Sequence, residues 1–461
     1  MFNPIDHVCL QQRRHRLAEL VNGRVLLWSG STVPRNFAAN SFPFRASSHF
    51  LYLAGIPLQN AVLGLESGQL TLFMDDPPPE AILWHGPSPS RGDVAALIAA
   101  VTHYPLSALP SWAEDAATLP APTLATRQEQ TALLGRTLTE MGQGEQGVLV
   151  DPRDRQLAQA MVTLRLQQDQ GAIEQLQEAA QVTVAAHLAG MQMSQPQSEA
   201  AVRAAIESVF SAHQCSTAYT SIVTVQGEIL HHDRYTHSCC PGDLLLVDAG
   251  AETPYGWAAD VTRTWPVSGQ FSATQRHLYE IVLAVHDACI AEAAPGVEFR
   301  NLHLLAAHQI TSGLVEVGIL KGDPDELVER DAHALFFPHG VGHLLGLDVH
   351  DMEDLGDLAG YAPGRQRCDR PGLRYLRLDR PLQPNMLVTI EPGFYQIPAL
   401  LNDPELRCTY QDCVNWDRLA QFADVRGIRI EDDVLITETG CQILTSALPT
   451  TVDEITALLQ D

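Results

Sequence analysis

The sequence lacks the long apolar runs that mark exported and membrane-embedded proteins. Its first residues, MFNPIDHVCLQQRRHRLAEL, contain no apolar core of the kind found in secretory signal peptides. No stretch approaches the roughly 20 apolar residues that a membrane-spanning helix needs. We therefore expect a cytoplasmic protein that does not bind a membrane.

The cysteines show no pattern of pairing. There are nine, an odd number, with no CxxC pair and no Cys/His spacing typical of zinc sites, although Cys239 and Cys240 are adjacent. This usage predicts reduced thiols in a cytosolic protein rather than a disulfide framework.

Basic residues are scarce as well. The chain has 29 Lys+Arg against 55 Asp+Glu, a formal net charge of −26. Nucleic acids and anionic membranes would repel such a surface, so neither is an expected partner. We find no internal repeat and no low-complexity tract. The 461 residues, 45% of them hydrophobic, instead predict two or three domains with a large packed core.

The order of the predicted elements divides the chain into a smaller N-terminal domain (1–155) and a larger C-terminal domain (156–461). The N-terminal domain alternates strands with helices, and its expected strands are Val25–Trp28, Phe50–Ile56, Ala61–Leu65 and Leu70–Met74. The C-terminal domain opens with amphipathic helices over Ile173–Met191 and Glu199–His213 and then mixes strands with helices. The expected fold class is therefore α/β (α+β).

Two aspartates lie at strand ends in the C-terminal domain. LLLVDAG places Asp248 at the end of an apolar strand, and the chain returns at Asp260 in DVTRTWPV, where Asp260, Thr262 and Thr264 share a face. The separation, 260 − 248 = 12 residues, suits a hairpin that brings the two carboxylates together. For Asp248 alone, capping of the following turn is the simpler interpretation.

The segment HGVGHLLGLDVHD carries three histidines, His339, His343 and His350, and its second half, LGLDVHD (345–351), is a predicted strand. A single histidine is most often a hydrogen-bonded polar residue of no special function. Three in this short segment, beside a set of carboxylates, favour metal or substrate binding.

Two glutamates complete the set. MLVTIEPG ends an apolar strand in Glu391, and GIRIEDDVLIT places Arg429 and Glu431 on one strand face. A half-buried strand with a surface ion pair would explain the second pattern. The functional alternative is that Glu431 binds metal while Arg429 orients the ligands from behind.

Together these motifs offer four carboxylates and one imidazole: Asp248, Asp260, His343, Glu391 and Glu431. Two divalent cations would balance the four negative charges. Hard oxygen ligands favour Mn²⁺, with Zn²⁺ or Co²⁺ as alternatives. The sequence therefore predicts a two-metal hydrolytic site.

In this order, DAG…D, HGVGHLLGLDVHD, TIEPG and GIRIEDD resemble the metallopeptidases of family M24, most of all its proline-specific branch of Xaa-Pro dipeptidases (prolidases) and Xaa-Pro aminopeptidases. The resemblance runs from about Ile173 to the C-terminus, and FPFRASSHFLYLAGI (42–56) resembles the N-terminal domain of the same branch. It implies a pita-bread (creatinase/aminopeptidase) domain behind a creatinase-like α/β domain, two Mn²⁺-type ions and a homodimer.

The resemblance also implies a role for each site residue. Asp248 would chelate one metal, Asp260 and Glu431 would bridge both, and His343 and Glu391 would complete the second. A metal-bridging hydroxide would attack the Xaa-Pro bond, with Glu391 passing protons. His339 and His350 would contact substrate and stabilise the tetrahedral intermediate, His231 in GEILHH would bind substrate, and Arg429 and Thr262 would support the ligands. One departure is His232, where this branch commonly has tyrosine.

The two activities of this branch differ in how the enzyme treats the C-terminal side of proline. GLRYLRLDRPLQPNM supplies Arg374, Arg377 and Arg380, and the resemblance implies that Arg377 binds a dipeptide carboxylate. An insertion over 395–425 could exclude longer peptides. These features favour an Xaa-Pro dipeptidase. The alternatives are an Xaa-Pro aminopeptidase acting on longer proline-containing peptides and, more remotely, a pita-bread binding module without catalysis.

Overall fold

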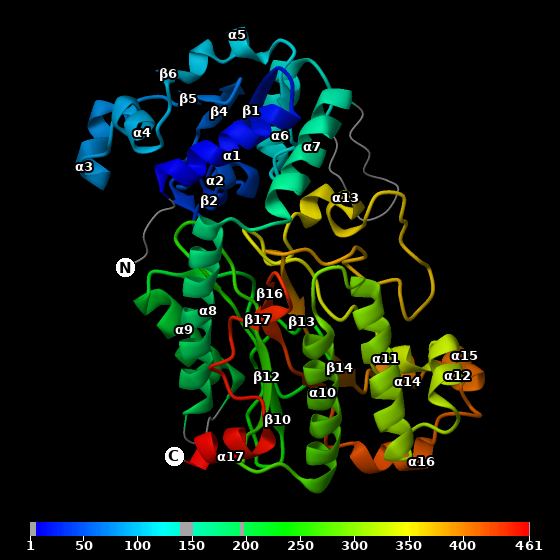
Figure 1. The fold of residues 1–461 in the computed structure, drawn as a ribbon. Helices are drawn as coiled ribbons and strands as arrows, with labels where there is room; N and C mark the ends of the chain where they lie inside the picture. Colours follow the sequence, from blue (N-terminus) through cyan, green and yellow to red (C-terminus); the bar gives the residue numbers. More distant parts are fainter. Residues whose placement is uncertain (1–5, 139–150, 194–197, 461) are drawn as a thin grey trace. The chain divides into compact units, whose positions relative to one another are not determined.

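The computed structural model describes residues 6–138, 151–193 and 198–460 (Figure 1). The chain folds into two compact units. Unit 1 comprises Met1–Gln175, Pro254–Trp257 and Met352–Ala359, and unit 2 comprises Leu176–Thr253, Ala258–Asp351 and Gly360–Asp461. Both units mix helices with strands, as expected. No helix in the described ranges combines the length and apolarity needed to cross a bilayer.

A five-stranded mixed sheet forms the centre of unit 1, in the order β6-β5-β4-β1-β7. Its strands are β1 (Arg24–Trp28), β4 (Val62–Glu66), β5 (Gln69–Phe73), β6 (Thr102–Tyr104) and β7 (Ala117–Thr118). The three central strands pair antiparallel, whereas β6 and β7 add parallel edges. Leu26, Val62 and Phe73 are buried on this sheet with Leu109 and form part of the core.

Helices and a short hairpin complete unit 1. They are α1 (His7–Leu20), α2 (Ser48–Ala54), α3 (Ile82–His85), α4 (Arg91–Leu97), α5 (Pro110–Ala113), α6 (Leu124–Leu134), α7 (Pro152–Arg165), α13 (Asp357–Gly360), β2 (Pro34–Phe37), β3 (Asn40–Ser41), and the 3₁₀ turns η1 (Pro79–Ala81), η2 (Leu106–Ala108) and η4 (Glu353–Leu355). The helix α7 runs across the predicted domain boundary at 155, and that boundary stays a prediction.

The predicted strand Phe50–Ile56 is wrong, because these residues belong to helix α2 and the turn that follows it. All seven residues of α2 are buried, and Gly55 ends the helix in the left-handed conformation with φ 75°. An apolar run buried on every side has no periodicity that separates helix from strand. The glycine that stops the helix was the available signal.

Two short segments from later in the chain complete unit 1. The guanidinium of Arg13 lies 5.5 Å from the centre of the Trp257 ring, and Arg45 donates to the carbonyl of Gly256 at 3.4 Å. His49 Nε2 lies 3.0 Å from a carboxylate oxygen of Asp354. The first 175 residues are therefore not the whole of this unit.

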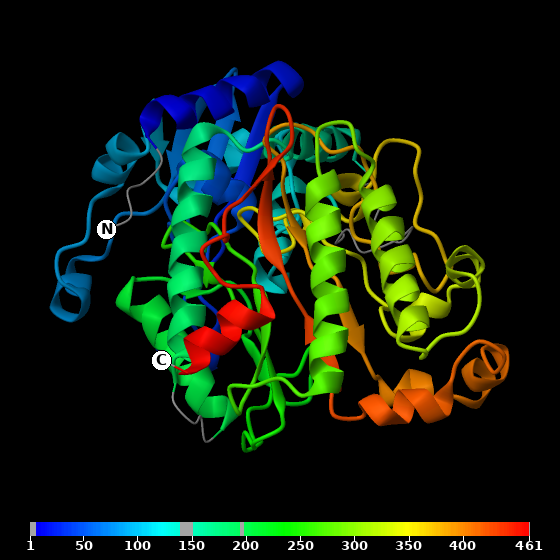
Figure 2. The same cartoon turned by 60° about the horizontal axis from the view of Figure 1, so that its bottom comes forward.

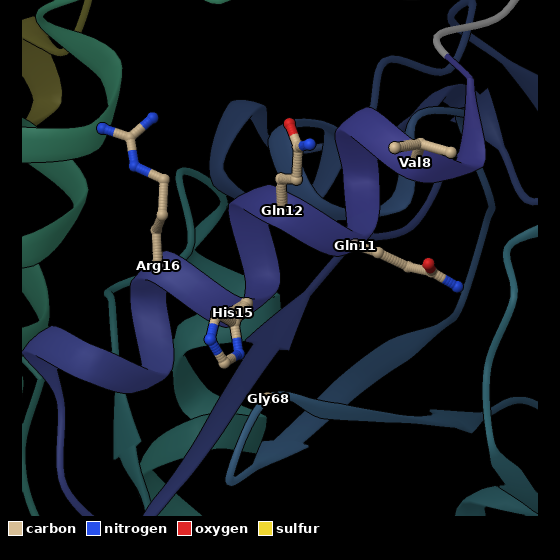
Figure 3. Close-up of a pocket in the computed structure, with 6 residues that line it drawn as sticks. All are labelled: Val8, Gln11, Gln12, His15, Arg16 and Gly68. Atoms are coloured by element: carbon tan, nitrogen blue, oxygen red, sulfur yellow. The ribbon is translucent and has the colours of Figure 1, made fainter.

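The outer side of α1 carries a shallow concavity lined by Val8, Gln11, Gln12, His15, Arg16 and Gly68 (Figure 3). The labelled side chains point in different directions instead of converging on one point. This surface therefore offers no defined binding geometry.

Unit 2 is built from small antiparallel sheets flanked by long helices (Figures 1 and 2). The sheets are β9 (Ile222–Thr224), β10 (Leu244–Asp248) and β12 (Thr262–Pro266); β13 (Leu387–Ile390), β16 (Asp432–Ile436) and β17 (Cys441–Ile443); β14 (Gly393–Tyr395) and β15 (Gly427–Arg429); and β8 (Ser216–Thr217) and β11 (Ala251–Glu252). The long helices are α8 (Gln170–Met191), α9 (Glu199–Ala212), α10 (Ala273–Glu292) and α11 (Phe299–Glu316). Residues 170–175 of α8 belong to unit 1. In both views α8 and α10 run alongside the strands.

Shorter helices fill the second half of unit 2. They are α12 (Pro324–Glu329), η3 (Ala332–Leu335), α14 (Pro398–Leu401), α15 (Pro404–Thr409), α16 (Trp416–Leu419), η5 (Ala420–Phe422) and α17 (Val452–Gln460). The predicted insertion over 395–425 thus forms α14, α15, α16 and η5 between strands β14 and β15. Whether it excludes long peptides stays a prediction.

The register of strand pairing brings together the strand ends that carry the predicted site residues. Antiparallel pairing of β10 with β12 sets Asp248 opposite Thr262, which confirms the predicted hairpin. The strand predicted at 345–351 is wrong, because only Leu344 forms an isolated bridge there and Asp351 N–H turns back to the Leu344 carbonyl at 2.9 Å. The glycine at 346 and the two aspartates in LGLDVHD favour turns over a ladder.

The predicted strand over 427–437 is interrupted. It forms β15 and β16, and the break falls at Ile430 and Glu431. The Glu431 N–H donates to the Thr262 carbonyl at 3.0 Å, so the chain contacts a different sheet at this point. The interruption lets Glu431 leave one sheet and face the strand that carries Thr262.

A glycine substitution tests the tightness of the hairpin. A Cβ on Gly250 would lie 1.7 Å from the Ala259 carbonyl oxygen, whereas a Cβ on Gly440 would meet nothing within 4 Å. We expect Gly250→Ala to destabilise the protein by about 2 kcal/mol or more, because backbone would have to move. Thermal unfolding of the matched control Gly440→Ala should be close to wild type. Equal melting temperatures for the two variants would contradict this close approach.

Candidate metal centre

Acidic and imidazole side chains converge at the ends of the unit 2 strands. Ligand atoms of Asp260, His343 and Glu431 all lie within 4.8 Å of one another, and the three residues are buried. The Nε2 atom of His343 is 3.4 Å from Asp260 Oδ2 and 3.6 Å from Glu391 Oε1. Four of the five predicted ligands therefore surround one small volume.

The fifth predicted ligand, Asp248, joins this group through a shared tyrosine. The hydroxyl of Tyr219 lies 2.5 Å from Asp248 Oδ1 and 2.5 Å from Asp260 Oδ1. One phenolic hydrogen can be donated to only one of these oxygens at a time. The two aspartates are therefore close, as the hairpin prediction required.

Burial and mutual repulsion make these carboxylates poor anions by themselves. Burial, followed by the charge of Asp248, raises the pKa of Asp260 to about 8. Burial also raises the pKa of Glu391 to about 7. The pKa of Glu431 lies well above its usual range, because burial is reinforced by the charges of Asp260 and Glu391. A set of oxygen ligands that repel one another is suited to divalent cations.

The ring of His343 has the orientation of a metal ligand. Its Nδ1 lies 3.0 Å from its neighbour's carbonyl, that of Leu344, which fixes the proton on Nδ1 and leaves the Nε2 lone pair facing the carboxylates. The backbone N–H of His343 donates to Thr389 Oγ1 at 3.1 Å, which holds the segment in place. The ring of His350 packs edge-on against it, with centroids 4.4 Å apart. The donor set therefore fits divalent metal.

Arg429 lies directly behind the ligands and is buried. Its guanidinium donates to Asp248 Oδ2 at 2.5 Å, to Thr262 Oγ1 at 2.9 Å and to the Tyr395 hydroxyl at 3.0 Å. Thr262 Oγ1 in turn donates to Glu431 Oε2 at 2.7 Å. These contacts place Arg429 and Thr262 where they can orient the ligands, and that role remains a prediction.

His339 is held by protein groups on both sides of its ring. Nδ1 donates to the Gly340 carbonyl at 2.8 Å, and Nε2 accepts from the Tyr395 hydroxyl at 2.8 Å. Burial, followed by the Arg429 charge, lowers the pKa of His339 to about 3, so the ring is neutral. Contact between this ring and substrate would require one of these two hydrogen bonds to be exchanged.

The remaining predicted residues lie around the same site. The His231 ring is exposed to solvent, yet partial burial and the charges of Arg429 and Arg377 lower its pKa. Among the three candidate arginines, Arg374 is exposed, whereas Arg380 is buried and donates to the Tyr361 carbonyl at 2.9 Å. Arg377, half-buried and near His231, is the one best placed to meet a ligand.

Three residues of the site were missed by the sequence analysis: Tyr219, Tyr395 and Asp433. Tyr219 sits in STAYTSIV, where no local pattern marks it, and Tyr395 follows the Glu391 turn on β14. Asp433 accepts the backbone N–H of Asp260 at 3.2 Å. The run EDD at 431–433 was a signal for Asp433, because successive acids in an apolar strand need buried partners.

Two family profiles match the chain. The profile of metallopeptidase family M24 matches residues 174–438, and the profile of the aminopeptidase P N-terminal domain matches residues 10–121. Among solved structures, the aminopeptidase PepP of Pseudomonas aeruginosa has a TM-score of 0.81 at 28% identity and covers 100% of this chain and 99% of its own. The predicted pita-bread domain and the predicted aminopeptidase P-like N-terminal domain are thereby confirmed.

Similar proteins with assigned names include both activities of the branch. A probable Xaa-Pro aminopeptidase of Leptosphaeria maculans is 33% identical and covers 91% of this chain and 72% of its own. The human Xaa-Pro dipeptidase is 38% identical, but over only 55% of this chain and 52% of its own. A variant of Escherichia coli aminopeptidase P, solved in complex with substrate, has a TM-score of 0.79 at 28% identity and covers 99% of both chains.

The raised pKa values predict how the metal-free protein responds to pH. Asp260 and Glu391 titrate at about 8 and about 7 in the folded state, whereas unfolded carboxyls titrate at about 4. Above pH of about 4 the folded state holds protons that the unfolded chain has lost, so stability falls as pH rises to about 8. Melting temperatures after chelation should drop over this range, and added Mn²⁺ should flatten the dependence.

A matched variant isolates the site from other titrating groups. Metal-free Asp260→Asn should show a shallower fall in melting temperature with pH than the metal-free wild type, because one repelling carboxylate is gone. A metal-free wild type that is more stable at pH of about 8 than at pH of about 5 would contradict the predicted repulsion.

Proposed function

Because the chain belongs to metallopeptidase family M24, we propose that it is an Xaa-Pro aminopeptidase, which removes the N-terminal residue from peptides with proline in second place. Full-length similarity supports this choice. The fungal aminopeptidase relative and the solved aminopeptidase P structures span nearly the whole chain, N-terminal domain included. The dipeptidase similarity is higher in identity but confined to about half of the chain. The preference for a dipeptidase in the sequence analysis therefore gives way to its alternative.

We propose that two divalent ions occupy the carboxylate cluster, with Mn²⁺ as the first candidate. The residues that would hold them are Asp248, Asp260, His343, Glu391 and Glu431. Bound ions of this kind supply Lewis-acid polarisation of a carbonyl and activation of water. Their charge would also relieve the repulsion that raises the carboxyl pKa values, so binding should add stability to the fold.

Other steps of the proposed reaction, proton transfer, orientation of the carboxylates and contact with substrate, are assigned to residues of the chain. Glu391 is the most exposed of the four acids, with 17% side-chain exposure against 8% for Asp260, so it can meet water and accept a proton. Arg429 holds the Asp248 carboxylate in place and offsets its charge. We assign contact with the substrate backbone to His350, which is edge-on to His343, and to His231, which is exposed to solvent. His339 is held in place by its hydrogen bond with the Tyr395 hydroxyl.

Proline at the second position imposes a particular kind of recognition. The scissile Xaa-Pro bond is a tertiary amide without an N–H, so the enzyme cannot bind it through that donor. Recognition must use the ring and the free N-terminus. The imidazole wall formed by the partly exposed His339 and the exposed His231 offers a shape for this task, with Tyr395 buried behind His339.

Peptide length tests the proposal. Purified protein with added Mn²⁺ should cleave Ala-Pro-Ala faster than Ala-Pro by roughly tenfold or more, because a dipeptide forfeits the binding energy of the third residue. The same protein after treatment with EDTA should cleave neither. Faster cleavage of Ala-Pro would return the assignment to an Xaa-Pro dipeptidase. If the metal-loaded protein cleaves neither peptide, a pita-bread binding module is favoured. This assay does not test the predicted cytoplasmic location or the predicted dimer.

The dipeptidase remains the second candidate because of the placement of Arg377. A guanidinium fork near His231 suits the free carboxylate of a dipeptide. If that clamp operates, Arg377→Ala should raise KM for Ala-Pro by roughly tenfold and change KM for Ala-Pro-Ala much less. The exposed Arg374→Ala serves as the control, with unchanged KM for both. Equal effects of Arg377→Ala on both peptides would remove the clamp.

A further inference from the structure

The loop that carries His231 touches the start of strand β15 at one point. There Gly227 and Gly427 lie backbone to backbone: a Cβ on Gly227 would be 2.8 Å from the Gly427 oxygen, and one on Gly427 would be 2.3 Å from the Gly227 carbonyl. Such an approach is open only to glycine on both sides. Four residues further along the loop comes His231, and two residues further along β15 comes Arg429.

An ion pair fastens this contact. The guanidinium of Arg426 donates through Nε to Glu228 Oε2 at 2.9 Å and through a terminal nitrogen to Glu228 Oε1. The Glu228 side chain is only 8% exposed, against 39% for Arg426. A nearly buried carboxylate depends on its partner, so the pair holds the loop more firmly than an exposed pair would.

Arg426 adopts a backbone conformation that arginine rarely takes. Its φ is 55°, in the left-handed region, where glycine carries no steric penalty. A non-glycine residue there carries a steric penalty and persists where surrounding contacts impose it. For Arg426 the contact is with the Glu228 carboxylate. This ion pair therefore compensates for the unfavourable backbone conformation of Arg426.

Arg426 also closes the helical insertion. The insertion leaves β14 after Tyr395 and returns at Arg426, where the Gln396 N–H donates to the Arg426 carbonyl at 2.8 Å. The Gln396 side chain donates to the Phe422 carbonyl at 2.7 Å. From the other side, Leu230 in the His231 loop packs in a cluster with Tyr395 and Ile397. The base of the insertion and the His231 loop thus share one junction.

We propose that Glu228 and Arg426 are positioning residues that hold His231 in its place on the substrate wall and join that wall to the base of the helical insertion. Their ion pair joins the loop to the residue before β15 and includes no predicted metal ligand, so the pair acts on His231 through the loop. The effect on peptide cleavage rests on the proposed function above. The tethering of the loop does not, and it can be measured separately.

Arg426→Gly gives a discriminating test because it removes the ion pair while relieving the backbone. We expect a moderately lower melting temperature, because relief of the backbone offsets only part of the cost of leaving the nearly buried Glu228 carboxylate unpaired. The KM for Ala-Pro-Ala should rise by roughly tenfold, with a much smaller change in kcat. Hydrogen exchange of the 226–232 backbone should become faster. Glu228→Gln should reproduce the kinetic change, and Arg426→Lys should restore part of it by keeping the charge without the fork.

The matched control is Arg330→Ala. Arg330 forms an exposed ion pair with Asp412, inside the same insertion, at 2.9 Å. Its loss should leave both KM and exchange of the 226–232 backbone at wild-type values. An equal rise in KM would mean that the insertion is sensitive to any lost anchor, and would overturn the specific role of Arg426.

The two readouts separate this inference from the proposed function. A wild type that cleaves no Xaa-Pro peptide would defeat the proposed function, and exchange alone would then decide whether the pair tethers the loop. Unchanged exchange in Arg426→Gly overturns the tether whatever the kinetics. Faster exchange with unchanged KM in an active enzyme overturns the positioning role.

Discussion

The structure of unit 2 depends on the cost of burying several negative charges in one place. Asp260, Glu391 and Glu431 all hold their protons more tightly than free carboxyls, because each is largely removed from water and faces the others. Isolated charges in a protein interior are costly unless they are paired or coordinate metal. The surrounding groups are arranged to contain this repulsion: a guanidinium against Asp248, a tyrosine between two aspartates and a histidine with its lone pair turned inward.

Arg429 connects these groups into one arrangement. It donates to Asp248 on β10 and to Thr262 on β12, and it also contacts Tyr395, the tyrosine that holds His339. The side chain itself comes from β15, near the far end of the sequence. The strands therefore cannot shift independently without breaking a charged hydrogen bond. This coupling explains how acidic and histidine side chains from widely separated motifs meet with little tolerance in position.

The sequence was most informative where a polar residue interrupts an apolar strand. Asp248, Glu391 and Glu431 stand out for that reason, and the histidine-rich segment added His343. Tyr219 could not be found, since a tyrosine before a strand is ordinary and its role depends on a contact across 41 positions with Asp260. The apolar run at 50–56 predicts a strand but forms helix α2 and a turn, because burial on all sides erases the periodicity that separates helix from strand. The proposal about substrate length rests on similarity along the whole chain, which local motifs do not report.

Unit 1 is completed by residues 254–257 and 352–359, which arrive from within the catalytic half of the chain. Synthesis on the ribosome proceeds from the N-terminus, so the sheet β6-β5-β4-β1-β7 is available long before Trp257 and Asp354 emerge. The contacts of Arg13 with Trp257 and of His49 with Asp354 cannot form before that point. The N-terminal unit therefore reaches its final packing only after most of the catalytic half exists. The two units therefore cannot complete their folding one after the other during synthesis. No single cleavage of the chain separates one whole unit from the other.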